Sequence, residues 1–140
     1  MDTHRPPINM LAVATLDVVI TDDAIRQFVA LSGNRNRIHS DDDFAAKSVF
    51  GRRIAPGLMV ASYISALIAN ELPGSGAIYL GQDLRFEAPV YLGDTITVTV
   101  GVIEQPRKDR VRLETTCTNQ ARLRMLSGEA LVKKPRSDHA

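Results

Sequence analysis

The pattern of hydrophobic and polar residues changes once along the chain, from a helical spacing in the first half to alternation in the second. A helix is predicted to start after Thr21, whose hydroxyl can cap it, with two aspartates in the first turn. Ile25, Phe28 and Val29 then fall on one face, as expected of an amphipathic helix. Gly33 follows where this helix is predicted to end.

Two further helices are predicted before the pattern changes. A short one over residues 41–47 is expected to carry Phe44 and Ala45 inward. Residues 57–69 are apolar nearly all round, which is typical of a helix buried on most sides. This stretch is too short to cross a bilayer, because spanning takes about 20 predominantly apolar residues.

The second half of the chain alternates with a period of two and predicts β-strands separated by Gly, Pro and Asn turn signals. We expect these strands to follow one another as antiparallel neighbours. The sequence therefore predicts an α+β domain in which the long apolar helix fills the concave face of a curved antiparallel sheet. The predicted strands cover residues 77–86, 95–103, 110–118 and 121–132, with a weaker candidate at 10–19.

Length and charge indicate a single domain without a nucleic-acid or membrane-binding signature. A chain of 140 residues can bury roughly two thirds of its unfolded surface around one core. Lys and Arg number 17 against 16 Asp and Glu, for a net charge of +1, and neither sign forms a long block. The most basic stretch, residues 107–112, alternates like the solvated face of a strand, which we favour over a phosphate site.

The lone cysteine and the N-terminal residues bear on the compartment. Cys117 can form neither an intrachain disulfide nor a cysteine metal cluster, which suits a reducing cytoplasm. The first residues lack the apolar core of a signal peptide. We therefore expect a cytoplasmic protein.

The first candidate for chemistry is His39, at the end of a run of Ser, Asn and Arg residues after the first helix. His4 and His139 lie in the polar ends of the chain, so His39 is the histidine that a folded core can hold in place. An imidazole titrates near neutral pH and can serve as acid or base. Taken alone, His39 is more readily explained as an ordinary polar loop residue than as a catalytic one.

Four segments in the same order resemble the MaoC-type hot-dog dehydratases, a family that includes (R)-specific enoyl-CoA hydratases. They are residues 31–41, 50–59, 84–90 and 93–95, and the similarity extends over nearly the whole chain. The resemblance implies a hot-dog fold, with a long central helix wrapped by an antiparallel sheet. It also implies a homodimer, or a multiple of one, that binds acyl thioesters in a tunnel near the subunit interface.

The working motif of that family resembles Gly-Asp-x-Asn-Pro-x-His, whose Asp and His hold and activate the water that adds to the enoyl double bond. On this chain His39 takes the histidine position and Asn36 the asparagine, while Asn34 stands at the aspartate and Arg37 at the proline. The change at Asn34 matters most, because an amide has nearly the shape of a carboxylate but cannot take a proton near neutral pH.

Three explanations of Asn34 stay open at this point. The chain is a natural member that uses His39 alone, for another reaction or a slower rate; or it is a binding protein without chemistry; or it is an engineered variant. One of the carboxylates at 41–43 can also replace the missing one, although acids in the first turn of a helix more often cap it.

The resemblance assigns further roles along residues 57–62. Gly57 begins the apolar helix, and its N–H can receive the thioester oxygen as it becomes enolate-like; alternatively Gly57 only shapes a tight entry. Ser62 matches a serine that assists the histidine, yet a helical serine often just bonds its own backbone. Asn36 and Met59 are the candidate substrate-binding residues, with core packing the more usual role for Met59.

These observations predict a hydratase or dehydratase that reversibly adds water to a trans-2-enoyl-CoA or acyl-carrier substrate. The catalytic residues are expected to be Asn34, His39, Gly57 and Ser62. A hot-dog thioesterase and an acyl-CoA-binding pseudoenzyme are the alternatives. With no phosphate loop or metal-ligand spacing in the sequence, neither cofactor nor metal is expected, and CoA enters as part of the substrate. Basic residues at the rim that suit its phosphates are Arg52, Arg53 and Arg85, although exposed arginines are more often simply solvated.

Overall fold

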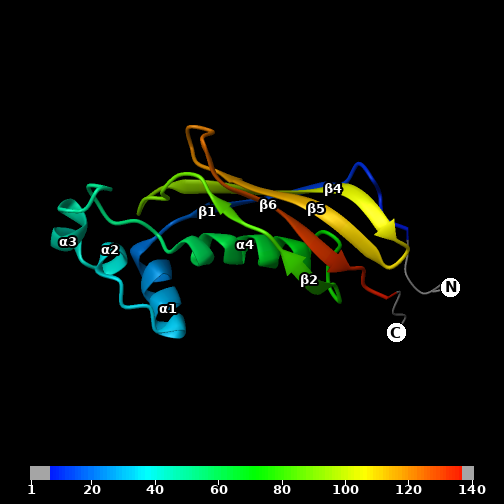
Figure 1. The fold of residues 1–140 in the computed structure, drawn as a ribbon, viewed down its shortest axis with the longest axis horizontal. Helices are drawn as coiled ribbons and strands as arrows, with labels where there is room; N and C mark the ends of the chain where they lie inside the picture. The colour runs from blue at the N-terminus through cyan, green and yellow to red at the C-terminus, as the bar shows by residue number, and fades with distance from the viewer. Residues whose placement is uncertain (1–6, 137–140) are drawn as a thin grey trace.

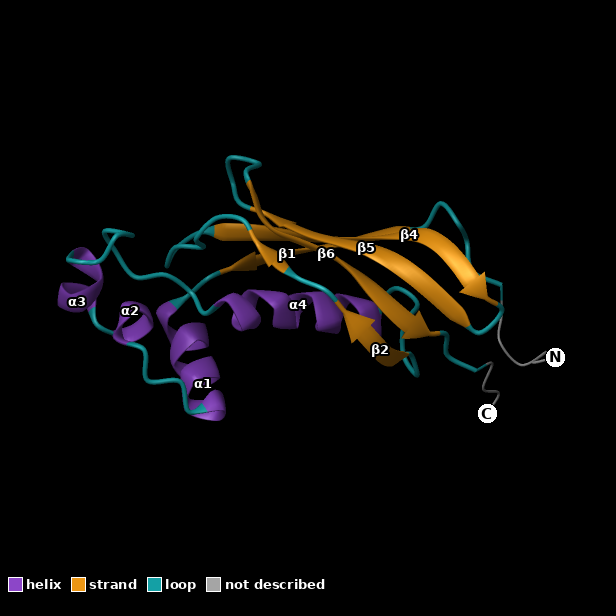
Figure 2. Cartoon of the chain, in the orientation of Figure 1, coloured by secondary structure: helices purple, strands orange, loops and turns teal. Residues whose placement is uncertain are grey.

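The computed structural model describes residues 7–136 and has two layers, a curved antiparallel sheet and a long helix on its concave face. Figure 2 shows this helix, α4 (Gly57–Asn70), running beneath the strands, with three short helices gathered at one end of the molecule. The predicted α+β architecture is therefore correct. His4 and His139 lie outside the described residues.

The sheet is a continuous antiparallel array in the order β1-β4-β5-β6-β2, with β3 also paired to β6. Strands β4, β5 and β6 are consecutive in sequence and pair as antiparallel neighbours, as predicted, and residues 107–110 of the most basic stretch form the tight turn between β4 and β5. The strands are β1 (Val13–Val19), β2 (Ile78–Gln82), β3 (Arg85–Phe86), β4 (Thr95–Arg107), β5 (Arg110–Thr118) and β6 (Arg124–Lys133).

The strand predicted over residues 77–86 differs from the structure in two ways. It is divided into β2 and β3, with a register shift between Tyr79 and Gly81. It also pairs with β6 and not with β4, its successor in sequence. Because β1 and β5 occupy the two sides of β4, the segment cannot pair with β4, and it completes its backbone hydrogen bonds at the open side of β6.

The core lies between α4 and the concave face of the sheet. Ile96, Val98 and Val100 alternate along β4 and are fully buried, and they face Met59 and Ile64 of the helix layer within one hydrophobic cluster. Each such side chain stabilises the fold by about 1.5–3 kcal/mol relative to exposure. The sheet covers only one side of the helix, so Leu58, on the opposite side, stays 63% exposed. Burial of α4 is therefore less complete than its composition predicts.

The short helices follow local capping signals. In α1 (Asp22–Ser32), the Thr21 hydroxyl accepts the Ala24 N–H at 3.1 Å, and Gly33 ends the helix with a φ of 76°. The predicted helix 41–47 is α3 (Asp42–Ala46), whereas α2 (Arg37–Ser40) was not predicted.

The inward position predicted for Phe44 is wrong. Ala45 is buried, as expected, but Phe44 is 39% exposed. The Arg37 guanidinium lies 4.7 Å from the centre of the Phe44 ring, so a cation–π contact replaces core packing. No helix in residues 7–136 has the length and apolarity needed to span a bilayer.

Candidate active site

The loop between α1 and α2 is organised by the two asparagines of the predicted motif. The Asn34 Oδ1 accepts the Asn36 N–H at 2.9 Å, and the Asn36 Oδ1 in turn accepts the Ile38 N–H at 3.2 Å. Asn36 thereby caps the start of α2. This short helix, nucleated by side-chain caps, carries His39 toward the body of the domain.

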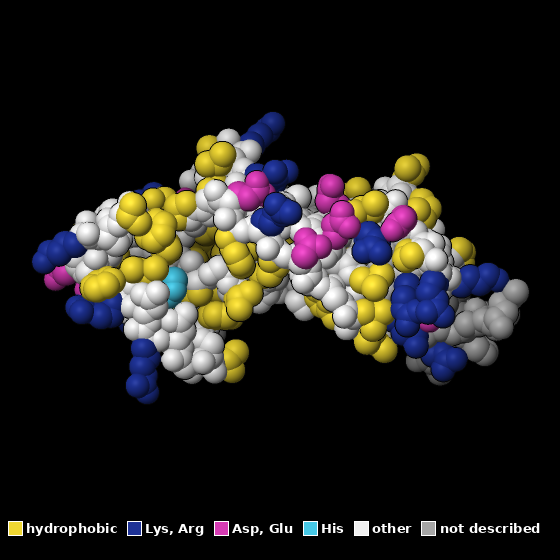
Figure 3. All heavy atoms as spheres, in the orientation of Figure 1, with side chains coloured by type: hydrophobic (Ala, Val, Ile, Leu, Met, Phe, Trp, Pro, Cys, Tyr) yellow, Lys and Arg dark blue, Asp and Glu magenta, His cyan; other side chains and the backbone are white. Residues whose placement is uncertain are grey.

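His39 is held by one ring nitrogen and presents the other. Its Nδ1 lies 2.8 Å from the backbone oxygen of Ile54, and His39 as a whole is only 6% exposed. A carbonyl oxygen only accepts, so Nδ1 carries the proton in the neutral ring and Nε2 has the free lone pair. Within the described part of the chain Nε2 has no hydrogen-bond partner and is not sealed from solvent. Figure 3 shows the histidine side chain (cyan) at the surface among hydrophobic side chains.

The hydrogen bond at Asn34 also fixes which way its amide points. Because the Asn36 N–H must meet an oxygen, Oδ1 is engaged and the NH₂ group is the part left to meet a ligand. An NH₂ group donates two hydrogen bonds and accepts none. Asn34 can therefore hold a water by donating to its oxygen, but it cannot remove a proton from it.

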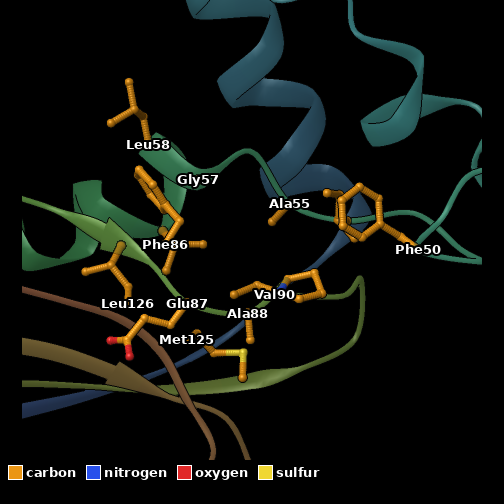
Figure 4. A pocket seen from close by; sticks show the side chains of 13 residues that line it. Phe50, Ala55, Gly57, Leu58, Phe86, Glu87, Ala88, Val90, Met125 and Leu126 are labelled. Carbon is orange, nitrogen blue, oxygen red and sulfur yellow. The ribbon is translucent and has the colours of Figure 1, made fainter.

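An apolar cavity of about 510 Å³ opens at the first turn of α4 (Figure 4). Ile54, whose carbonyl binds the His39 ring, belongs to its wall, while Asn34, Asn36 and His39 are not among the wall residues of the single chain. The site thus consists of a polar loop joined to an apolar cavity through the segment around Ile54. The wall is formed by Phe50, Ile54, Ala55, Gly57, Leu58, Val60, Phe86, Glu87, Ala88, Pro89, Val90, Met125 and Leu126.

Gly57 places a helix N-terminus in the cavity wall. It is the first residue of α4, and its N–H has no hydrogen-bond partner among residues 7–136. The first N–H groups of a helix carry partial positive charge and favour a nearby anion or developing oxyanion. The Phe86 ring lies against this residue, so that a Cβ added at Gly57 would come within 2.6 Å of the ring Cε1 atom (Figure 4).

Replacing Gly57 with alanine is expected to lower activity more than stability. The three atoms nearest to the new methyl group all belong to the Phe86 side chain, which is 55% exposed and can swing away. Alanine also favours a helix over glycine. We expect a Tm within a few degrees of the wild type but a loss of about tenfold to hundredfold in kcat/KM from the displaced cavity wall. Gly101→Ala, whose Cβ meets only an ordinary 3.6 Å contact with Val13, is the control; equal losses in both variants would contradict the role.

The structure places three other predicted residues away from the reacting position. The Ser62 hydroxyl donates to the Met59 carbonyl at 2.6 Å, within its own helix. Met59 is buried in the core and is not in the cavity wall, so its predicted substrate contact is not supported. Asp41 caps α3 by accepting the Phe44 N–H, and this bond and then Arg37 hold the pKa of its carboxyl below the usual value. Asp41 is therefore a cap and not a replacement base.

The residues that the motif did not reveal come from β3 and its following loop. Phe86 and Glu87 line the cavity although they lie far along the chain from His39. Arg124 meets both Glu87 carboxylate oxygens, at 2.9 Å and 2.8 Å, and holds the pKa of that carboxyl below its usual range. This charge is already paired. Only the segment 84–90, which carried part of the family resemblance, signalled this part of the site.

The three arginines expected at a basic rim have different surroundings. Arg52 stacks on Tyr91, with its guanidinium carbon 3.8 Å from the ring centre, and Arg85 is exposed on β3. Arg53 is only 5% exposed, so its expected place at the surface is wrong. It is buried because a backbone carbonyl and a carboxylate satisfy its guanidinium. No group of metal-ligating side chains occurs within residues 7–136.

Comparison with known proteins identifies the class to which this fold and site belong. Residues 6–125 match the MaoC like domain family, so the chain belongs to the MaoC-like family of hot-dog proteins. It is 40% identical to a 3-hydroxybutyryl-CoA dehydratase of Methylorubrum extorquens, over 96% of this chain and 91% of that protein. It is 43% identical to an (R)-specific enoyl-CoA hydratase of Rhodospirillum rubrum, over 87% and 85% of the two chains.

Solved structures agree with this assignment. The R-hydratase PhaJ1 of Pseudomonas aeruginosa superimposes with a TM-score of 0.89 at 42% identity, covering 92% of this chain and 83% of that one. The (R)-hydratase of Aeromonas caviae gives the same TM-score, 0.89, at 36% identity, covering 91% and 98%. The hot-dog fold predicted from the sequence is confirmed.

Proposed function

We propose that this protein is a hydro-lyase that reversibly adds water to the double bond of a trans-2-enoyl thioester. The observation that carries the proposal is His39, whose Nδ1 is held by the carbonyl of a cavity-wall residue while Nε2 keeps a free lone pair. The names of the relatives support the reaction class, since they are hydratases and dehydratases of CoA or acyl-carrier thioesters.

The proposed reaction needs a proton acceptor, a held water and a stabilised carbonyl. His39 Nε2 accepts a proton from the water as its oxygen bonds to C3 of the substrate, and the thioester oxygen gains the charge of an enolate. The unpartnered Gly57 N–H stabilises this oxygen. Protonated His39 then delivers this proton to C2 of the substrate. One molecule of water has thus been added across the double bond. Dehydration follows the same steps in reverse.

Asn34 serves in this scheme as a donor that holds the water oxygen and leaves the proton to His39. General acid–base catalysis by one positioned group is typically worth about 10²–10⁴-fold. The proposed enzyme therefore works with one such group where its family motif has two. Because Asn34 contributes no proton transfer, we expect a slower hydratase and not a changed binding site.

The cavity wall and the donor group suggest the substrate class. An apolar space of about 510 Å³ suits an acyl chain. Both CoA and an acyl carrier protein present the acyl group on the same kind of thioester, so either donor fits the proposal. We place the reaction in the reducing cytoplasm, on the strength of the lone buried cysteine.

We also propose that the protein acts as a homodimer or a multiple of one. β2 is an edge strand whose Ile78, Tyr79 and Leu80 are more than one third exposed. Pairing of this edge in a two-fold dimer covers these side chains and completes the backbone hydrogen bonds. Sedimentation is expected to give at least a dimer; a monodisperse monomer at dilute concentration contradicts it.

One comparison of assays separates the proposed reaction from its alternatives. Incubated with a short trans-2-enoyl-CoA, a hydratase lowers the enoyl absorbance without releasing thiol, whereas a thioesterase releases free CoA. A binding protein does neither, yet gains thermal stability from the ligand. We expect the first result. Release of thiol, or stabilisation without any spectral change, overturns the proposal.

A further inference from the structure

Arg53 is a buried charge next to the reacting histidine, and the chemistry proposed above does not use it. Its side chain is 5% exposed, between α1 and α2. Burying an unpaired guanidinium is costly, so a buried arginine persists only where its donors are matched by acceptors. The acceptors that Arg53 meets therefore indicate what it holds in place.

The first acceptor is the backbone of His39. The Arg53 Nε donates to the His39 carbonyl oxygen at 2.8 Å. The neighbouring residue completes the attachment, because the Ile54 N–H donates to the Ile38 carbonyl at 3.2 Å and the Ile54 carbonyl accepts from the His39 ring at 2.8 Å. Two consecutive residues thus hold both the backbone and the ring of the His39 region.

The second acceptor is a carboxylate from another helix. The Arg53 Nη2 donates to Asp22 Oδ1 at 2.5 Å, and Asp22 lies in the first turn of α1. Arg26 binds the other Asp22 oxygen at 2.8 Å, and Arg26 and then Arg53 hold the pKa of this carboxyl below its usual value. Asp42 of α3 lies further from Arg53, with an N–O distance of 3.8 Å. A single guanidinium therefore connects α1 to the carbonyl of His39.

We infer that Arg53 is a positioning residue, which together with Asp22 sets the orientation and tautomer of the His39 ring. Its fork of donors points in two directions at once, to the His39 carbonyl and to Asp22. If this carbonyl is released, α2 turns, the ring loses the Ile54 carbonyl, and Nε2 no longer keeps its lone pair toward the site. A four-residue helix has too few internal hydrogen bonds to hold this orientation alone.

Lysine is not equivalent at this position. Its ammonium carries the same charge but sits at one point and lacks the planar fork that reaches a carbonyl and a carboxylate simultaneously. Lysine at position 53 should therefore restore the orientation of His39 only in part. Arg26 provides the matched control, because it shares Asp22 with Arg53 but makes no hydrogen bond with His39.

The experiment compares wild type, Arg53→Met, Arg53→Lys and Arg26→Met by two measurements. The first is the tautomer of His39 in substrate-free protein, from long-range ¹H–¹⁵N spectra of histidine-labelled samples, with His39→Asn identifying its signals. We expect the Nδ1–H tautomer in the wild type and Arg26→Met, a mixture of both tautomers in Arg53→Met, and an intermediate spectrum in Arg53→Lys.

The second measurement is the kinetics of enoyl-CoA hydration, which rests on the proposed function. We expect kcat to fall about tenfold to hundredfold in Arg53→Met, with less loss in Arg53→Lys and KM within about twofold in both. The inference is overturned if Arg53→Lys matches the wild type in tautomer and kcat, or if Arg26→Met shifts the tautomer as Arg53→Met does. Arg53→Lys decides the question if Arg53→Met fails to fold. If the tautomer shifts in Arg53→Met but the wild-type protein shows no hydratase activity, the proposed function is refuted and the positioning role of Arg53 stands.

Discussion

Asn34→Asp is expected to raise the turnover of enoyl-thioester hydration by about 10²-fold or more, with little change in substrate affinity. One carboxylate oxygen can keep the hydrogen bond from the Asn36 N–H, now 2.9 Å from Oδ1. The second oxygen replaces the NH₂ group and accepts a hydrogen bond from the water, which the NH₂ group cannot do. The new group therefore stabilises the transition state, in which the proton is transferred, and leaves substrate binding nearly unchanged.

The measurement is kcat and KM for a short trans-2-enoyl-CoA in the two proteins at the same pH. Asn119→Asp is the matched control, because Asn119 also accepts backbone N–H groups through Oδ1, from Ala121 and Leu123, but at the β5–β6 turn. This variant adds the same charge and should leave turnover unchanged. An unchanged or lower rate in Asn34→Asp means that the chain uses another base or another reaction, and the hydratase proposal then rests on family membership alone.

His39→Asn is expected to lower turnover by about 10²–10⁴-fold while keeping the fold. The asparagine amide can donate to the Ile54 carbonyl in place of Nδ1, so this buried acceptor keeps a partner. What the variant lacks is Nε2, the proposed proton acceptor. A larger loss of Tm in His39→Ala than in His39→Asn would separate the structural hydrogen bond from the chemistry.

The two substitutions should not be additive. In the Asn34→Asp background, His39→Asn is expected to remove the whole gain, because two groups that share one water act as a unit. The double variant should therefore have the activity of His39→Asn alone. If the double variant keeps most of the gain, the new carboxylate works without His39, and the role proposed for its Nε2 is wrong.

Elements whose limits depend on a few neighbouring residues could be predicted from the sequence. α1 begins after Thr21 and ends at Gly33, and β5 spans the residues 110–118 that the alternation predicts. The asparagine caps in the loop that contains Asn34 and His39 are also interactions over two residues, but neither they nor α2 was predicted. Capping, turn conformation and alternation are properties of short segments, so the sequence determined them.

Only the tertiary structure decided which distant segments meet. β2 pairs with β6 and not with β4, whose two sides are occupied by β1 and β5. Phe86 lies against Gly57 although the two residues are 29 positions apart in the chain. Arg53 looks like a surface residue in sequence, and its burial follows from acceptors on α1 and α2. Strand order, cavity walls and the matching of a buried charge depend on contacts between residues far apart along the chain. Local patterns carry no information about the free energy of those contacts.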